Sequence, residues 1–424
     1  MLSVPAVVAA STQPPRRLGL RENLGQFSLL LLINAFVGAM VGMERSVLPL
    51  LAEQEFGIAS RTSILSFLLT FGVVKALANA FAGGAADRWG RRRVLLAGWV
   101  AALPVPFLIM FAPTWGWVVG ANVLLGINQG LCWSAAIVMK VDLVGPRQRG
   151  LAIGLNESSG YLAVSAAALA SGYLAARYGL RPEPFLIGVA AASGGILSSM
   201  FVKETREYAA MESATDGRRE EHSPSPRAVF GRVSWRDPSL RAVSQAGLVN
   251  NLNDGLSWGL FPLYFVSKGA TLEQTAALVA VYPAVWGIGQ LVTGYLSDRH
   301  GRKWLMACGM ILQGLALIAV AIGDQFGPWL ASMVSLGLGT ALVYPTFLGA
   351  VSDHSSPSWR ASAIGVYRWW RDLGYALGAL LVGGVADLFG IPVSIEMVGA
   401  LTVVSGIVVA TTYSEHPFPR ESPP

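Results

Sequence analysis

Residues 83–92 read Gly-Gly-Ala-Ala-Asp-Arg-Trp-Gly-Arg-Arg, and residues 294–303 read Gly-Tyr-Leu-Ser-Asp-Arg-His-Gly-Arg-Lys. The two stretches share a glycine, an aspartate–arginine pair, a second glycine and a following arginine at identical spacing, 211 residues apart. Each one closes an apolar run long enough to cross a bilayer and precedes another such run. The duplication predicts a chain built from two similar membrane-embedded halves.

The repeat extends beyond these two loops. At the same offset the polar and small residues that match are Gly126 with Gly337, Asp142 with Asp353, Pro146 with Pro357 and Arg149 with Arg360. Six apolar runs in each half make both halves enter the membrane in the same sense. Parallel repeats of this kind are related by an axis along the membrane normal, and substrates bind between them near the midplane.

The composition indicates that lipid surrounds most of the chain. Of the 424 residues 53% are hydrophobic and only 13% are charged, against about 25% charged in soluble domains. A membrane helix needs about 20 mostly apolar residues. On that rule the sequence predicts an all-α membrane protein with twelve spans, near 27–51, 63–84, 94–112, 116–139, 150–175, 184–202, 243–266, 274–296, 304–322, 328–351, 361–386 and 391–412.

Lysine and arginine set the expected orientation, because these residues gather in cytoplasmic loops. With the N-terminus placed inside, the cytoplasmic segments hold 23 of the 31 basic residues and the outer segments hold four. We therefore expect a multi-pass protein of the inner (plasma) membrane with both termini in the cytoplasm.

Five segments are expected along the chain. Residues 204–240 are rich in Glu, Arg, Ser and Pro, which is typical of a solvated linker with little fixed structure. Arginines follow the mildly apolar N-terminus, so we expect a disordered tail there and no cleaved signal peptide. The predicted segments are a tail at 1–26, a six-helix bundle at 27–203, the linker at 204–240, a second bundle at 241–412 and a tail at 413–424.

Other functional classes find little support. The net charge of +6 is spread over short loops and forms no basic domain, so we expect no nucleic-acid partner. Cys132 and Cys308 lie in separate apolar runs without ligand spacing and are interpreted as small core residues, not as disulfide or metal partners. No metal cluster, Gly-x-Ser-x-Gly or phosphate-binding Gly-x-x-x-x-Gly-Lys pattern occurs, so we expect neither an enzyme nor a cofactor.

The paired loops resemble the signature of the major facilitator superfamily, in its loop between spans 2 and 3 and the second copy between spans 8 and 9. The resemblance covers the whole membrane portion. It implies two six-helix bundles related by a pseudo-twofold axis, which expose a central site alternately to each side. It also implies that the loops latch one state, which makes gating candidates of Gly83, Asp87, Arg88, Gly90, Arg91, Gly294, Asp298, Arg299, Gly301 and Arg302. The alternative is a topology anchor without a switching role.

Two departures concern the antiporter branches of that family. These branches carry an arginine in span 4 where this chain has Asn122, ahead of a glycine motif at Gly126 and Gly130. They also carry a Gly-Pro pair in span 5, and residues 166–172 contain no proline. The departures weaken a drug/proton antiporter assignment but not the assignment to the superfamily.

Ionisable residues inside predicted spans are functional candidates, since a charge at the bilayer centre costs about 2.5–3.5 kcal/mol on insertion scales. The candidates for substrate or proton coupling are Asp254, Lys75, Glu157, Arg371, Asp372, Glu44, Arg45 and Arg368. In the superfamily spans 1, 4, 7 and 10 line the cavity, which adds Asn34, Asn122, Gln129, Asn250 and Tyr344 as expected polar lining. Internal pairing without contact to substrate is the alternative for each charge.

Depth along the helices suggests specific pairs. Lys75 and Asp372 each lie about 18 Å from the cytoplasmic edge, so they form an ion pair if spans 2 and 11 touch. Glu157 and Arg368 occupy equivalent positions in the repeat with opposite charges.

Together these features predict a secondary transporter. The favoured hypothesis is proton-coupled efflux of a small organic or anionic compound. A second is an uptake symporter or uniporter for a metabolite, and a third is a non-transporting membrane sensor or partner. The expected partners are a small-molecule substrate, protons and the lipid bilayer, with the protein as a monomer.

Overall fold

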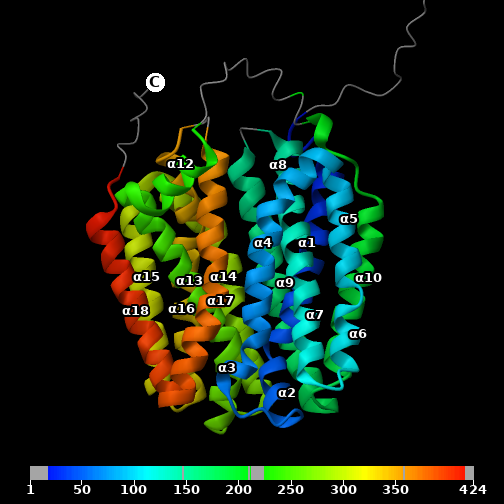
Figure 1. Cartoon of the computed structure of the whole chain (residues 1–424), viewed down its shortest axis with the longest axis vertical. Coiled ribbons are helices and arrows are strands. Elements are labelled where there is room, and N and C mark those ends of the chain that lie inside the picture. Colours follow the sequence, from blue (N-terminus) through cyan, green and yellow to red (C-terminus); the bar gives the residue numbers. More distant parts are fainter. Residues whose placement is uncertain (1–17, 146–147, 209–210, 212–223, 357–358, 416–424) are drawn as a thin grey trace, which may run out of the picture.

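The computed structural model describes residues 18–145, 148–208, 211, 224–356 and 359–415, and only the backbone of Asp87 and Asp298. Throughout this part of the chain the secondary structure is helical (Figure 1). The first half contains α1 (Leu24–Arg45), α2 (Leu48–Gln54), α3 (Arg61–Ile64), α4 (Ser66–Trp89), α5 (Arg91–Ala102), α6 (Val105–Met110), α7 (Trp115–Asn128), the π-helix η1 (Gln129–Trp133), α8 (Ser134–Val144), α9 (Arg149–Tyr178), η3 (Glu183–Phe185) and α10 (Leu186–Met200).

The second half begins with a short helical segment and continues with long helices. Its elements are α12 (Pro226–Gly231), the π-helix η4 (Arg232–Arg236), α13 (Pro238–Ser267), α14 (Leu272–His300), α15 (Lys303–Ile322), α16 (Phe326–Asp353), α17 (Arg360–Phe389) and α18 (Ile391–Thr412).

Eleven helices of the described chain are long and apolar enough to cross a membrane. The seventh of the twelve expected spans, at 243–266, lies in α13, which meets the length requirement but carries Asn250, Asn251, Asn253 and Asp254 near its middle. Of its 30 residues 24 are buried among other helices. A helix enclosed by protein needs no apolar surface, which explains why α13 does not meet the hydropathy requirement.

The linker prediction is wrong for part of 204–240. Residues 226–236 form α12 and η4, and Val229 and Val233 are buried against the second bundle. Residues 212–223 lie outside the described residues. The core prediction for the cysteines is confirmed for Cys132, which is buried, and wrong for Cys308, which is exposed on α15.

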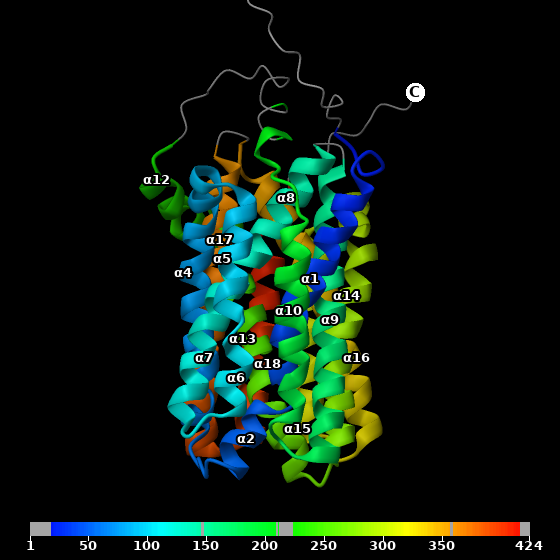
Figure 2. The same ribbon diagram turned by 90° about the vertical axis from the view of Figure 1, so that its right-hand side faces the viewer.

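The helices form two bundles that meet along a long seam (Figure 1), and in the view turned by 90° α14 lies beside α9 (Figure 2). In the first bundle α1 packs on α9 and α10, and α4 packs on α7; in the second, α13 packs on α17 and α18, and α15 packs on α16 and α18. Across the seam α9 lies against α14 and α4 lies against α17. Spans 2 and 11 therefore touch, which was the condition for an ion pair between Lys75 and Asp372.

The two ends of the bundles differ. We call the end that carries residues 18–23 and 413–415 the terminal end, and the end that carries α2 and α3 the far end (Figure 1). At the far end Asp387 of α17 accepts hydrogen bonds from the Ser60 hydroxyl at 2.9 Å and from the backbone N–H groups of Arg61 and Thr62. The far end of the seam is thus tied together through hydrogen bonds.

Candidate functional site

A small cavity lies on the seam between the two bundles. It is lined by residues from α4, η1, α8, α9, α16 and α17, namely Lys75, Asn79, Trp133, Ser134, Glu157, Tyr161, Tyr344, Arg368 and Arg371. Its volume of about 20 Å³ has room for roughly one water molecule. Five of the residues predicted from the sequence therefore meet at one place: Lys75, Glu157, Tyr344, Arg368 and Arg371.

A chain of hydrogen bonds crosses the seam beside this cavity. Arg371 donates to Asp372 Oδ1 at 2.7 Å and to the Tyr344 hydroxyl at 2.8 Å. Tyr344 in turn donates to Glu157 Oε2 of the other half at 3.1 Å. Asn79 of the first half donates to Asp372 Oδ2 at 2.6 Å. Both carboxylates are therefore held by donors from both bundles.

The expected ion pair between Lys75 and Asp372 is not formed, because Arg371 and Asn79 occupy both oxygens of Asp372. The half-buried Lys75 instead has its ammonium 5.0 Å from the ring centroid of Tyr375 and 5.5 Å from that of Phe71. Among the described residues it has no ionic partner within 4.0 Å.

Glu157 and Arg368 line the same cavity but do not pair with each other in the described chain. Glu157 Oε1 accepts from the Trp133 indole at 2.8 Å and from the Asn156 amide at 3.0 Å. The Nε atom of Arg368 is buried without a hydrogen-bond partner. Two cations, Lys75 and Arg368, thus stand at the cavity without a carboxylate of their own.

Aromatic rings close the cavity toward the far end. Tyr161 stacks on Trp286 at 3.5 Å between centroids, and Trp286 meets Tyr344 edge-on at 5.0 Å. A second stacked pair is formed by Tyr375 and Trp258, whose ring centroids lie 5.4 Å apart. Stacked rings from both bundles form a layer that separates the cavity from the buried groups beyond it.

A second group of charges lies beyond the aromatic layer. Asp254 accepts hydrogen bonds from the hydroxyls of Tyr282 and Tyr375. The Arg45 guanidinium lies 4.0 Å from the centroid of Trp258, and all three of its nitrogens are buried without a hydrogen-bond partner. Glu44 is fully buried and its Oε1 accepts only a long bond from Asn122, at 3.5 Å. The structure therefore separates Asp254, Arg45 and Glu44 from the cavity residues.

The two duplicated loops lie at the terminal end and have matching geometry. Gly90 and Gly301 adopt φ values of +96° and +88°, which glycine favours because it has no Cβ. Arg91 lies 3.4 Å from Asp142, and Arg302 pairs with Asp353 at the equivalent place in the other half. The two halves therefore hold their loops in the same way.

A family model described as Major Facilitator Superfamily matches residues 30–247 and 243–424. The chain belongs to the major facilitator superfamily. Solved structures of other transporters share the fold: a POT family transporter bound to a thioalcohol conjugated peptide superposes with a TM-score of 0.72 at 13% identity, covering 90% of this chain and 95% of that one. The nucleoside transporter NupG gives 0.71 at 14% identity, with 92% and 100% covered.

Relatives with closer sequences carry the name "Multidrug resistance protein MdtG". The protein of that name from Dickeya zeae is 26% identical over 369 residues, covering 84% of this chain and 86% of the relative. The one from Salmonella arizonae is 24% identical over 367 residues, covering 83% and 86%. As a superfamily member, this chain is a multi-pass membrane transporter and not an enzyme.

Sequence reasoning missed two carboxylates of the superfamily loops. Glu204 accepts from the backbone N–H groups of Arg91 and Arg92, each at 3.1 Å, and Glu415 accepts from the N–H of Arg302. The two glutamates are themselves 211 residues apart, so the repeat offset could have found them. Each carboxylate caps the helix that follows its loop, where a negative charge is favourable.

The remaining loop residues contribute less to this network. Arg88 and Arg299 are exposed, and Arg299 lies over the ring of Tyr295 at 4.5 Å. A Cβ atom at Gly83 would meet no described atom within 4 Å, and one at Gly294 would meet only Pro345, at 4.0 Å. The side chains of Asp87 and Asp298 lie outside the described residues.

Four polar residues expected along the superfamily cavity lie elsewhere. Asn34 donates to the backbone oxygen of Asn156 at 2.7 Å, and Gln129 donates to that of Val37 at 2.9 Å. Asn122 donates to the backbone of its own helix, and Asn250 is buried. Helical spacing placed these side chains on an inward face, but it could not distinguish contact with a neighbouring helix from contact with the cavity.

Proposed function

We propose that this transporter exports a small anionic organic compound in exchange for protons. The observation that carries the proposal is the imbalance at the cavity, where Lys75 and Arg368 have no carboxylate partner among the described residues. The nearby carboxylates of Glu157 and Asp372 are already engaged by donors from both bundles. An anionic group of the substrate would supply the charge that these two cations lack.

The proton step requires a carboxylate that can become accessible from each side in turn. Asp254 has two tyrosine hydroxyls as partners and no cation within 4.0 Å in the described chain. Asp372 forms a direct ion pair with Arg371, which favours its permanently charged form. We therefore rank Asp254 first as the proton carrier, with Glu157 and Glu44 behind it and Asp372 in a structural role.

The relatives support export, since their names refer to multidrug resistance. In the proposed orientation both termini lie in the cytoplasm, so the terminal end is the cytoplasmic end. This end carries most of the arginines. One proton moving inward and one monovalent anion moving outward together transfer two positive charges inward, each worth about 2.3 kcal/mol per 100 mV of membrane potential. That gain would drive an anion outward against its gradient, by a monomer that contains the whole site.

Resistance of an efflux-deficient host tests the proposal. Wild type and the variants Asp254→Asn and Lys75→Gln/Arg368→Gln are compared across antibiotics, dyes, metalloids and organic acids. We expect wild type to protect against at least one anionic compound, with protection lost in both variants. Asp324→Asn, an exposed carboxyl in a far-end loop, is the matched control. If no compound separates wild type from the empty host, efflux is wrong.

Uptake is the second candidate. It is favoured by the two departures from the antiporter pattern: α9 runs from Arg149 to Tyr178 without a proline, and span 4 carries Asn122 in place of an arginine. Counterflow of a labelled anion in vesicles of known orientation separates the two directions. A non-transporting sensor would show neither counterflow nor any loss on neutralising Asp254.

A further inference from the structure

The helical segment between the two bundles has an unusual surface. Residues 224–241 contain Arg227, Arg232, Arg236 and Arg241, with Asp237 as their one carboxylate. Asp237 Oδ1 accepts from the Leu240 N–H at 3.0 Å and so caps α13. The arginines in this stretch therefore give it a net positive charge at the terminal end of the molecule, where α12 lies (Figure 1).

This segment docks on the start of α17. The indole N–H of Trp370 donates to the Ser234 hydroxyl at 2.9 Å. The rings of Phe230 and Trp235 lie 6.3 and 5.7 Å from that of Trp370. Val233 of the same segment is fully buried in the core of the second bundle. The segment is thus held in one position by a hydrogen bond and by aromatic contacts.

Two of its aromatic side chains are nevertheless exposed. Trp235 is 61% exposed and Phe230 is 39% exposed, although both lie beside a membrane-spanning helix. Tryptophan favours the boundary between lipid headgroups and acyl chains, where its ring is in apolar surroundings and its N–H meets polar groups. The exposure of this pair is what a segment at headgroup depth would show.

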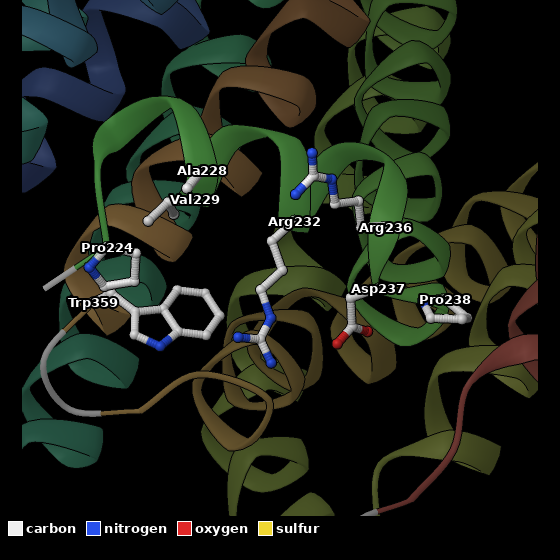
Figure 3. Close-up of a pocket in the computed structure, with 8 residues that line it drawn as sticks. All are labelled: Pro224, Ala228, Val229, Arg232, Arg236, Asp237, Pro238 and Trp359. Atoms are coloured by element: carbon white, nitrogen blue, oxygen red, sulfur yellow. The ribbon is translucent and has the colours of Figure 1, made fainter.

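A groove lies on the same helical segment (Figure 3). Its volume is about 440 Å³, and it is lined by Pro224, Ala228, Val229, Arg232, Arg236, Asp237, Pro238 and Trp359. The Arg232 guanidinium lies 4.9 Å from the Trp359 ring centroid, between that ring and Asp237 (Figure 3). Arg232 and Arg236 are both exposed, and neither forms an ion pair with a described residue.

We propose that this groove binds the phosphate headgroup of an anionic phospholipid of the surrounding leaflet. Arg232 and Arg236 supply the positive charge, and the exposed rings of Trp235 and Phe230 lie against the glycerol and upper acyl region. Basic segments next to membrane helices are attracted to anionic leaflets, with about a fivefold gain in affinity for each arginine near the surface. The proposal does not depend on the transported substrate.

Lipid binding to the full-length purified protein tests this site. Native mass spectrometry in detergent counts bound phosphatidylglycerol and phosphatidylcholine for wild type and for Arg232→Gln/Arg236→Gln. We expect wild type to prefer phosphatidylglycerol and the double variant to bind it about 25-fold more weakly, at fivefold for each arginine, with phosphatidylcholine unchanged. Arg232→Lys/Arg236→Lys keeps the charge and should recover most of the binding.

The matched control removes two other exposed arginines of the terminal end, Arg93→Gln/Arg206→Gln. An equal loss in both double variants would show a diffuse surface charge and overturn the site. Equal competition by inorganic phosphate would instead identify a free-anion site and also overturn it. Thermal unfolding of each variant excludes misfolding, and Trp235→Ala, which keeps every charge, should still lower phosphatidylglycerol binding severalfold.

Discussion

The two ends of the seam use the same pair of repeat-related helices, α9 and α17, in opposite ways. At the far end Gly172 and Gly383 are buried, and a Cβ atom at either would collide with Ala276 of α14 or with Thr62. At the terminal end their counterparts Gly154 and Gly365 would meet no described atom within 4 Å.

Each glycine pair is itself related by the 211-residue offset. The two glycines of each pair therefore have similar surroundings. The surroundings of the pair at the far end differ from those of the pair at the terminal end. Helices that approach this closely need small residues at the contact. At these positions the helices are packed at the far end and not at the terminal end, so the seam is closed at the far end, as one state of an alternating-access transporter would be.

The largest expected effect is at the middle of the seam. Asp372→Asn leaves the buried Arg371 without its counter-charge, and removing one partner of a buried ion pair costs about 3–5 kcal/mol. We expect a clear fall in the thermal unfolding temperature of the purified protein. Arg371→Gln/Asp372→Asn removes both charges and should be less destabilised than the single variant. A double variant that is worse than the single one would contradict this account of the pair.

A bulky residue at the packed end should have the next largest effect. Gly172→Leu cannot be accommodated against Ala276, so the far end should be forced apart and transport should fall about five- to 150-fold, since overpacking costs about 1–3 kcal/mol. Labelling of Thr62→Cys by a maleimide, located by mass spectrometry, should become faster. Gly154→Leu is the matched change at the separated end: it should leave that labelling unchanged and reduce transport by hindering the opposite closure.

A smaller shift is expected from the hydrogen bonds of Asp387. Asp387→Asn weakens the acceptor of the Ser60, Arg61 and Thr62 donors, but the site is exposed, so the effect should be about 1 kcal/mol or fivefold in population. Distances between spin labels across the far end would report this shift. Asp324→Asn lies on a loop of the same end and should leave those distances unchanged; an equal shift there would point to general loop charge.

The smallest effect is expected within the bundles. Glu204→Gln and Glu415→Gln each weaken the cap of one helix, which is worth about 0.3–1 kcal/mol. The thermal unfolding temperature should fall slightly, and the seam distances should stay as in wild type. A change in the seam distances would show that these caps act across the halves.

Most of the fold could be predicted from the sequence because its signals are long and repeated. Apolar runs locate the helices, and the duplicated loops relate Arg91 to Arg302 by a fixed offset. The polar helix α13 is also anticipated, although its asparagines make it differ from its neighbours in hydropathy. The helix at 226–236 was missed because four arginines and three prolines in 224–241 resemble a solvated linker.

The site could be predicted only in part. Burial cost selected Lys75, Glu157, Arg368 and Arg371 as candidates, and the structure brings these four residues together at one cavity. Depth alone could not choose the partner of Asp372, because its neighbour Arg371 and the facing Asn79 reach it first. Nor could periodicity show that Asn34 and Gln129 bind the backbone of adjacent helices. Partner choice depends on side-chain directions that a single helix does not fix.

Paired distances at the two ends of the seam test the central claim most directly. Spin labels at Arg177→Cys and Glu273→Cys report the far end, and labels at Leu151→Cys and Tyr295→Cys report the terminal end, with Cys132 and Cys308 replaced. In the protein without substrate we predict a short far-end distance and a long terminal-end distance. Gly172→Leu should exchange the two, and Gly154→Leu should preserve them. Distances that stay the same in both glycine variants, or that change together at both ends, would contradict alternating access at this seam.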